Sequence, residues 1–299
     1  MSEAERTPPS ALTRLVETLT RTLPDSVREL DALVTERLAR VPTRLNEYGV
    51  DRFGLEPEQA HRGLLPTALL YRHYFRVVTH GIEQVPEGRV LLIANHAGQL
   101  PFDAAMLGVA MLLEAEPPRL ARGLGEYWIP RLPFVSELVT RGGGLVGTPE
   151  NFRALIDAEE CVMVFPEGVR GMNKTFRERY RLQRFGTGFM RLAVETRTPI
   201  VPVGIVGSEE QQPGLWDLKP LARLLGMPAF PITPTFPLFG PLGLLPLPVK
   251  YRIHFGAPLR FEGSANEDDA AIQARVATVK IAIDKLLEAG RRERKNPFV

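Results

Sequence analysis

The sequence predicts an α/β protein in which helices flank a mostly parallel central sheet, preceded by an N-terminal helical region. From residue 77 onward, short apolar runs alternate with helical stretches, and this alternation is the sequence form of βαβ units. Before that point, the apolar residues recur with helical spacing instead. No repeat with a period of roughly 20 to 50 residues is visible, which argues against a solenoid or a propeller.

The N-terminal apolar residues have the spacing of amphipathic helices. Positions 11–41 predict two such helices, broken at Pro24. They fit either a helical hairpin packed on the main domain or an element on a membrane surface. A further apolar helical stretch ends near Phe75, where we place the boundary between a helical region, residues 1–75, and the main domain, residues 76–299.

Apolar runs and helical spacing locate the elements of the main domain. A run of four to seven apolar residues predicts a buried strand, and a longer stretch with helical period predicts a helix. We expect strands at Val77–Ile82, Val90–Ala94, Val162–Phe165, Ile200–Val206 and Tyr251–Phe255, and helices at Phe102–Glu114, Pro149–Ala158, Gly186–Thr196 and Glu267–Ala289.

Composition and charge restrict the class of protein. The chain has 299 residues, of which 44% are apolar and 24% charged, as in ordinary globular proteins. A formal net charge of +2 is too small to indicate nucleic-acid binding. The single cysteine, Cys161, excludes an intramolecular disulfide. Because the first ten residues lack the pattern of a signal peptide, a cytoplasmic location is the default expectation.

Basic residues are nevertheless concentrated in two segments, residues 170–184 and residues 291–295. Such clusters fit either a solvated helix face or a surface that binds phosphate groups of a substrate or of a membrane. A third segment, Leu224–Val249, has no charged residue and contains seven prolines. Since proline breaks helices, this segment fits an apolar loop that covers a pocket or one that enters the membrane interface.

A histidine follows the apolar run Val90–Ala94. His96 stands in a predicted loop, and Asp103 falls in the first turn of the helix that follows. If the loop folds back, the Asp103 carboxylate accepts a hydrogen bond from the imidazole of His96 and fixes its tautomer. A histidine held in this way is a general base for a hydroxyl group. If the loop does not fold back, His96 is a surface residue and Asp103 only caps a helix.

Three glycines, Gly142, Gly144 and Gly147, match the G-x-G-x-x-G pattern of dinucleotide-binding proteins. The next residues, Thr148 and Pro149, predict a helix that starts only after all three glycines. A dinucleotide site needs the helix to start among them, at the pyrophosphate, so this pattern is not expected to bind a nucleotide.

The segment Phe165–Arg170 follows another predicted strand, which places Glu167 and Arg170 at the carboxyl edge of the sheet. Ligands of open α/β sheets bind at this edge. An arginine there can bind phosphate, and Glu167 can accept from a hydroxyl group or orient the arginine. A structural Glu–Arg pair is the alternative. Further along, Pro202 within an apolar run indicates an edge strand, a bulge or a break near a pocket.

Taken in order, these blocks resemble the glycerolipid acyltransferase family over residues 77–257. Asn95 and His96, followed by Asp103, are similar to the first block of that family, in which the histidine is the base and the aspartate orients it. Arg141 stands where the second block has an arginine that binds the acceptor. The chain has six residues between His96 and Asp103, where the family usually has four, and this points toward a branch similar to monoacylglycerol acyltransferases.

The third and fourth blocks of the family are also matched. Phe165–Arg170 is similar to the block Phe-Pro-Glu-Gly-x-Arg, so the resemblance implies that Glu167, Gly168 and Arg170 contribute to the acceptor site. Pro202, with the valine before it, resembles the fourth block, which is linked to binding of the acyl donor.

The resemblance implies an O-acyltransferase that moves a fatty acyl group from coenzyme A or acyl carrier protein to a hydroxyl of a lysophospholipid or glycerolipid. It implies no metal and no cofactor besides this thioester co-substrate. The expected partners are a lipid acceptor, an acyl thioester and a membrane surface, with the protein peripheral to the membrane. The alternatives are an inactive lipid-binding protein of the same fold and a hydrolase, although the G-x-S-x-G pattern of serine hydrolases is absent from the sequence.

Overall fold

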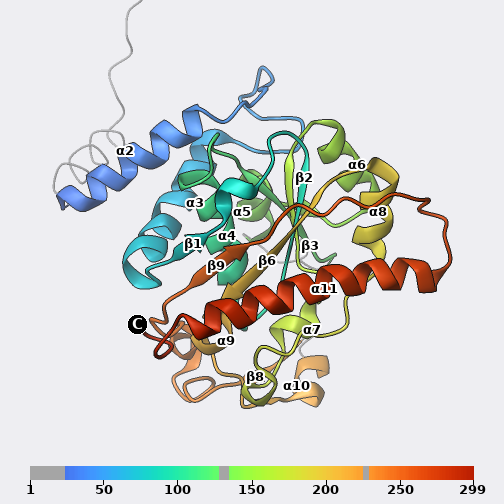
Figure 1. Cartoon of the computed structure of the whole chain (residues 1–299). Helices are drawn as coiled ribbons and strands as arrows, with labels where there is room; N and C mark the ends of the chain where they lie inside the picture. Colours follow the sequence, from blue (N-terminus) through green and yellow to red (C-terminus); the bar gives the residue numbers. More distant parts are fainter. Residues whose placement is uncertain (1–23, 128–134, 225–228) are drawn as a thin grey trace, which may run out of the picture.

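The computed structural model describes residues 24–127, 135–224 and 229–299, and within them the chain forms a central seven-stranded sheet (Figure 1). The strand order is β1-β9-β6-β2-β5-β3-β4. Every neighbouring pair in this sheet is parallel except β6 and β9, which confirms the predicted fold class. The strands are β1 (Val78–His80), β2 (Val90–Ala94), β3 (Ala121–Gly125), β4 (Leu145–Val146), β5 (Cys161–Val164), β6 (Ile200–Val206) and β9 (Arg252–Phe255).

Helices cover both faces of the sheet, and a small hairpin of β7 (Trp216–Asp217) and β8 (Pro231–Ile232) lies outside it. Figure 1 shows α11 as the long red helix that crosses the sheet. The helices are α2 (Asp25–Ala39), α3 (Pro57–Leu69), η1 (Leu70–Tyr74), α4 (Phe102–Leu113), α5 (Val135–Arg141), α6 (Pro149–Asp157), α7 (Val169–Met172), α8 (Gly188–Thr196), α9 (Ser208–Gln211), α10 (Lys219–Leu224) and α11 (Asp269–Arg292), with short turns η2 (Ile82–Gln84), η4 (Phe176–Glu178) and η5 (Gly240–Leu244).

Strand β2 shows why a central parallel strand has a continuous apolar sequence. Side chains of a strand point alternately to the two faces. Val90, Leu92 and Ala94 pack with α2, α3 and α4, whereas Leu91 and Ile93 pack with α6, α8 and α11. All five residues are 0% exposed, because helices cover both faces of the sheet.

The cysteine of strand β5 provides a direct test of this packing. Cys161 is 1% exposed, and burial raises the pKa of its thiol to about 11. Since the thiolate is the reactive form, we expect no modification of the folded protein by a thiol reagent at pH 8. The measurement is the absorbance of released thionitrobenzoate with and without guanidinium chloride. One reactive thiol per chain should appear only in denaturant, and rapid labelling without it would contradict the packing of β5.

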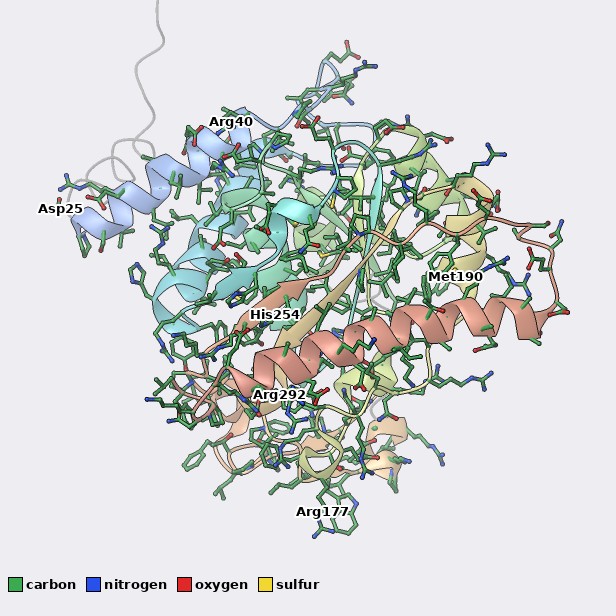
Figure 2. The ribbon with its side chains drawn as sticks, in the orientation of Figure 1. Asp25, Arg40, Arg177, Met190, His254 and Arg292 are labelled. Carbon is green, nitrogen blue, oxygen red and sulfur yellow. The ribbon has the colours of Figure 1, made fainter. Side chains whose placement is uncertain are left out.

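Helix α2 is the second of the two predicted N-terminal helices; the first, in residues 11–23, lies outside the described residues. Figure 2 labels Asp25 and Arg40 near the two ends of α2. Its Leu30 and Val34 join the core that contains α4. Arg37 is buried and donates through Nε to the Leu112 carbonyl in the last turn of α4 at 2.9 Å. A terminal nitrogen of Arg37 donates to the Ala115 carbonyl just beyond the helix, so Arg37 satisfies carbonyls that α4 itself does not bond.

The strand β3 and the edge strand β4 were not predicted; β3 contains Arg122, a residue type that is rare inside proteins. Arg122 is 3% exposed and donates to Asp51 Oδ2 at 2.5 Å and to Glu160 Oε1 at 3.0 Å. These two carboxylates make the burial of its charge tolerable. The sequence around Arg122 therefore resembles a loop, although the chain is extended and paired there.

Pro202 lies in β6, an interior strand between β9 and β2, so the edge strand, one of its three expected settings, is wrong. The Pro202 carbonyl accepts from Gly256 N at 2.8 Å, just after the last residue of β9. The proline nitrogen lies on the same side of its strand, so it faces the point where β9 has ended. The missing N–H therefore costs only the last hydrogen bond of that ladder.

The helix start predicted after the three glycines is confirmed. Helix α6 begins at Pro149, and the Thr148 side chain caps it by accepting from Asn151 N at 3.1 Å. The glycines therefore lie before the helix, in the turn around β4, and not at a helix N-terminus where a pyrophosphate would bind.

Candidate active site

The loop after β2 brings His96 and Asp103 together. Gly98 adopts a left-handed backbone with φ +83°, and the chain then enters α4 at Phe102. The His96 Nδ1 atom lies 2.7 Å from Asp103 Oδ2, so the loop folds back as the dyad requires. The His96 side chain is 10% exposed and that of Asp103 is 0% exposed. The pair is thus held in a largely dry environment.

Two backbone amides fix the Asp103 carboxylate, one in the loop after β2 and one in the first turn of α4. Ala97 N donates to Oδ2 at 2.9 Å, and Ala104 N donates to Oδ1 at 2.8 Å. These two amide donors satisfy the buried charge, which would otherwise be costly. Because Oδ2 also faces His96 Nδ1, the imidazole is oriented with Nε2 as its remaining nitrogen for chemistry.

The imidazole is further restrained by contacts from the strand β5 side. The Phe165 ring lies against the His96 ring, with 4.5 Å between the ring centroids and 34° between the planes. Gly171 of α7 lies against His96 as well, since a Cβ atom there would stand 2.9 Å from His96 Cβ and 2.7 Å from its carbonyl oxygen. The site therefore has no room for a side chain at position 171.

Glu167 holds the backbone of His96. It is 1% exposed, and its Oε1 accepts from His96 N at 2.9 Å while its Oε2 accepts from Gln183 N at 2.6 Å. Its nearest cation is Lys174, whose Nζ lies 3.6 Å from Oε2. The Glu–Arg pair considered from the sequence does not form, because Glu167 turns inward to two backbone amides and a lysine instead of outward to Arg170.

Lys174 belongs to this buried network and not to the surface cluster in which the sequence placed it. It is 6% exposed and donates to Glu209 Oε1 at 2.7 Å. Burial raises the pKa of Glu209 to about 7, although Lys174 opposes this change. The lysine thus links Glu167 to the segment that follows β6.

The raised pKa of Glu209 predicts how stability depends on pH. In the folded protein this carboxyl keeps its proton up to about pH 7, whereas its ordinary pKa is 4.5. Its contribution to stability is therefore fully present below pH 4.5 and is lost as the pH rises through about 7. Between these limits the free energy of unfolding of Glu209→Gln should increase relative to the wild type as the pH rises, measured by urea denaturation. The exposed Glu58→Gln should show no such trend.

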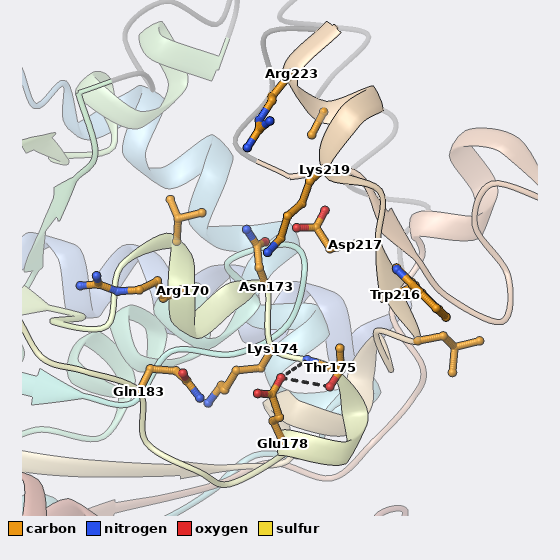
Figure 3. Close-up of a pocket in the computed structure, with 13 residues that line it drawn as sticks. Arg170, Asn173, Lys174, Thr175, Glu178, Gln183, Trp216, Asp217, Lys219 and Arg223 are labelled. Carbon is orange, nitrogen blue, oxygen red and sulfur yellow. Dashed lines mark hydrogen bonds between the residues drawn. The ribbon is translucent and has the colours of Figure 1, made fainter.

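A cavity of about 660 Å³ lies on the other side of α7. Val169 and Arg170 of α7 line it, opposite a wall formed by β7 and α10. Figure 3 shows Lys219 and Arg223 extending from α10 toward the α7 side of this cavity. Four cationic side chains, Arg170, Lys174, Lys219 and Arg223, and two carboxylates, Glu178 and Asp217, therefore line a space large enough for part of a substrate.

The structure places the remaining predicted site residues in different surroundings. Asn95 is 0% exposed, and its side chain donates to the Ile205 carbonyl at 3.0 Å and accepts from Ile205 N at 2.7 Å. It joins β2 to β6, and its predicted contact with substrate stays a prediction. Pro202 is likewise buried in β6.

Gly168 and Arg141 are the last two of the predicted site residues. Gly168 has φ +56° and lets the chain turn from β5 into α7, and a Cβ atom there would meet Glu126 Oε1 at 2.7 Å. Arg141 ends α5 and donates to Glu56 Oε2 at 3.2 Å, and it is not among the residues that line the cavity. The structure thus brings together His96, Asp103 and Glu167 and leaves Arg141 at a separate position.

Several residues around the site were not found from the sequence. Gln211 donates through Nε2 to the Leu100 carbonyl at 3.1 Å, and Gln212 Oε1 accepts from Leu100 N at 3.1 Å, so both support the loop after His96. Lys219 and Arg223 were also overlooked. Their spacing of four residues on a short helix was the signal that could have identified them as one basic face.

A family model described as "Acyltransferase" matches residues 76–206, the part of the chain that contains the dyad, Glu167 and Arg170. "Uncharacterized protein Rv0502" of Mycobacterium tuberculosis is 42% identical over 252 residues, which are 83% of this chain and 70% of that protein. The mouse protein named "DGAT1/2-independent enzyme synthesizing storage lipids" is 23% identical over 206 residues, 69% of this chain and 59% of that protein.

Among solved structures, the 1-acyl-sn-glycerophosphate acyltransferase PlsC from Thermotoga maritima aligns with a TM-score of 0.48 and 15% sequence identity, over 91% of this chain and 87% of that one. The matched family model and the similarity to the mycobacterial and mouse proteins agree with the blocks found in the sequence. The chain therefore belongs to the acyltransferase family that this model describes.

Proposed function

We propose that this acyltransferase moves a fatty acyl group from an acyl thioester, of coenzyme A or acyl carrier protein, to a hydroxyl group of a lysophospholipid or glycerolipid, with His96 as the general base. The observation that carries the proposal is the hydrogen bond of 2.7 Å between His96 Nδ1 and the buried Asp103. It holds the tautomer in which Nε2 has a free lone pair, and it stabilises the imidazolium that forms when Nε2 takes a proton.

In the proposed step, Nε2 of His96 removes the proton of the acceptor hydroxyl as the oxygen attacks the thioester carbonyl carbon. The tetrahedral intermediate then collapses, the C–S bond breaks, and the imidazolium returns the proton to the leaving thiolate. Asp103 is unchanged throughout. General base catalysis of this type contributes about 10²- to 10⁴-fold, and positioning of the two substrates supplies much of the remainder.

A phosphate-bearing substrate is favoured by the cations of the cavity. Arg170, Lys219 and Arg223 line it, and the α7 turn that carries Arg170 contacts His96 through Gly171. A guanidinium group binds phosphate with two parallel hydrogen bonds. This arrangement supports a lysophospholipid acceptor, with Arg170 and Gly168 contributing to its site, and Arg141 remains a proposed contact for the acceptor.

A neutral glyceride is the second candidate acceptor. The similarity to the mouse storage-lipid enzyme favours it, and so does the spacing of six residues between His96 and Asp103. In that case the cations of the cavity would bind the phosphates of the donor rather than those of the acceptor.

The test is transfer of radiolabel from a long-chain acyl-coenzyme A and from the matching acyl carrier protein thioester to a panel of lysophospholipids, monoacylglycerol and water. We expect a labelled lipid product with the wild type and none with His96→Ala. The exposed His73→Ala is the matched control and should keep full activity.

Each other outcome of this assay contradicts the proposal in a different way. Label found only in free fatty acid would indicate a thioester hydrolase. Lipid binding without any turnover on either donor would indicate a binding protein. Product formation that survives His96→Ala would leave the enzyme class intact but remove His96 as the base.

We also propose that the protein works at a membrane surface, through an apolar lobe made of residues 213–224 and 229–249. In the described residues no helix is long and apolar enough to cross a bilayer. The lobe instead exposes large apolar side chains to solvent, which is unusual for a soluble surface. They are Leu215, Trp216, Leu218, Leu224, Leu238, Phe239, Leu242, Leu245 and Leu247.

Basic residues adjoin this lobe. The Phe176 amide donates to the Gly214 carbonyl at 2.7 Å, so η4 lies against the first part of the lobe. Arg177, Arg179 and Arg181 are exposed there, and Figure 2 shows Arg177 at the lower end of the molecule, where Figure 1 places α10 and β8. Apolar insertion combined with neighbouring cations is the usual basis of binding to anionic membranes.

Reversing these three charges to glutamate should weaken flotation with anionic liposomes at low salt. Each cation near an anionic surface contributes about 1 kcal/mol, so we expect a loss in partitioning of roughly 10²-fold, smaller at high salt. The control reverses three exposed arginines of the N-terminal region, Arg28, Arg44 and Arg62, for the same change in net charge. Equal losses in both triple variants would contradict the proposed surface.

A further inference from the structure

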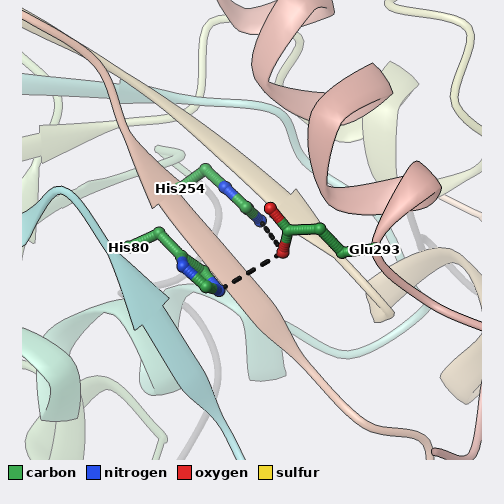
Figure 4. A group of neighbouring side chains, drawn as sticks. All are labelled: His80, His254 and Glu293. Atoms are coloured by element: carbon green, nitrogen blue, oxygen red, sulfur yellow. Dashed lines mark ion pairs between the residues drawn. The ribbon is translucent and has the colours of Figure 1, made fainter.

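Two histidines and a glutamate meet at the β1 edge of the sheet, which is the edge opposite β4. His80 ends β1 and His254 lies in β9, and the two are paired in the register of these parallel strands. Glu293 caps the C-terminal end of α11. Figure 4 shows the three side chains converging, and the ligand atoms that they offer all lie within 4.8 Å of one another.

The two distances from the histidines to Glu293 are close to those between ligands around one ion. His80 Nε2 lies 3.4 Å from Glu293 Oε2, and His254 Nε2 lies 3.6 Å from the same oxygen. Around a tetrahedral Zn²⁺ with bonds of about 2.0–2.1 Å, neighbouring ligand atoms are roughly 3.3 Å apart. Hydrogen bonds between nitrogen and oxygen are shorter, at about 2.9 Å, so these contacts are too long for good hydrogen bonds.

His254 provides an independent observation. It is 5% exposed, and its Nε2 atom has no hydrogen-bond partner in the described part of the chain. Leaving a buried polar atom without a partner is costly, and such atoms are rare in native proteins. The ring is accommodated by Gly290 of α11, where a Cβ atom would stand 2.7 Å from Nε2. The buried Nε2 atom of His254 thus faces Glu293 but lacks a hydrogen-bond partner in the described part of the chain.

We propose that His80, His254 and Glu293 form a binding site for Zn²⁺, or a similar divalent transition metal, that ties the end of α11 to the β1 edge of the sheet. Two imidazole nitrogens and one carboxylate oxygen are ligands that Zn²⁺ prefers, and a water molecule completes the coordination. The ion supplies the partner that His254 Nε2 lacks. The site is separate from the dyad, because β9 and β6 lie between β1 and the strand that ends before His96.

Binding requires one local movement. The His80 and His254 rings stack with 4.4 Å between centroids and 12° between planes, and two parallel rings cannot both direct a lone pair at one ion. The His80 and Glu293 side chains are each 43% exposed, whereas that of His254 is only 6% exposed. His80 therefore turns out of the stack while His254 stays in place.

The test uses the untagged chain, stripped of metal with a chelator and titrated with Zn²⁺ by calorimetry in a buffer that does not bind metals. We expect one Zn²⁺ per chain, with an affinity that falls at least about tenfold in His80→Ala and in Glu293→Gln. Both replaced side chains are partly exposed, so these variants should fold. His73→Ala and Glu288→Gln, an exposed histidine and a carboxylate of α11, are the controls and should bind as the wild type does.

Thermal unfolding supplies the second measurement. Zn²⁺ should raise the Tm of the wild type and of both controls, and it should leave the Tm of His80→Ala and His254→Ala unchanged. Absence of binding up to millimolar Zn²⁺ would overturn the proposal. Binding that is retained in His80→Ala and Glu293→Gln but lost in His96→Ala would overturn it too, because the ion would then sit at the dyad.

Discussion

Asp103→Asn should lower the turnover number for acyl transfer by about 10²- to 10⁴-fold while leaving the fold intact. With the asparagine oxygen in the Oδ1 position, it still accepts from Ala104 N, which donates to Asp103 at 2.8 Å, whereas the bond from Ala97 N to Oδ2, at 2.9 Å, is lost. Its amide group then faces His96 Nδ1 and donates to it, so the proton of the ring moves to Nε2. In that tautomer Nε2 cannot accept the proton of the acceptor hydroxyl.

The measurement is the turnover number with saturating donor and acceptor, together with the circular dichroism spectrum and the Tm. Asp157→Asn, an exposed aspartate at the end of α6, is the matched control and should have wild-type kinetics. Full activity in Asp103→Asn would show that the orientation of the His96 ring does not limit the reaction.

The second large effect is expected at Gly171, which has no side chain that could take part in the reaction. A methyl group added by Gly171→Ala would stand 2.7 Å from the His96 carbonyl oxygen and 2.8 Å from Glu167 Cβ, so α7 or the loop after β2 must move. Overpacking of this kind costs about 1–3 kcal/mol of stability. A displacement of roughly 1 Å at a catalytic group can lower the rate by about 10²-fold, and we expect a loss of this size.

Gly108→Ala separates this effect from a general effect of the substitution. Gly108 lies in the interior of α4, the helix that carries Asp103, and a Cβ atom there meets nothing within 4 Å. Alanine in a helix interior should stabilise the protein by about 0.5–1 kcal/mol and leave activity unchanged. Similar kinetics in the two variants would contradict the close packing of Gly171 against His96.

The elements that a sequence can identify here are those whose residues share one environment. The strands β2 and β6 were predicted with their observed bounds, since every residue in them is buried. Strand β3 was missed because Arg122 owes its burial to Asp51, 71 positions away in the chain. A local pattern contains no information about a partner so distant.

The same limit applies to the site. The sequence predicted the His96–Asp103 contact conditionally, because the geometry depends on the loop between them, and Gly98 with φ +83° provides the required turn. The inward turn of Glu167 and the burial of Lys174 were not predictable, since each depends on tertiary partners, the His96 amide and Glu209. A charged residue in a polar segment gives no sign that such a partner exists.

Helix α2 lies outside the region that the family model matches, yet it packs on α4. The region by which the family is recognised starts at residue 76, whereas Arg37 closes the end of α4, and Leu30 and Val34 complete the core beneath that helix. A chain shortened to the recognised region would leave the Leu112 carbonyl of α4 without its Arg37 donor and would expose apolar surface next to the helix that carries Asp103. The region matched by the family model is therefore smaller than the set of elements that pack together, and α2 is part of what holds the helix that carries Asp103.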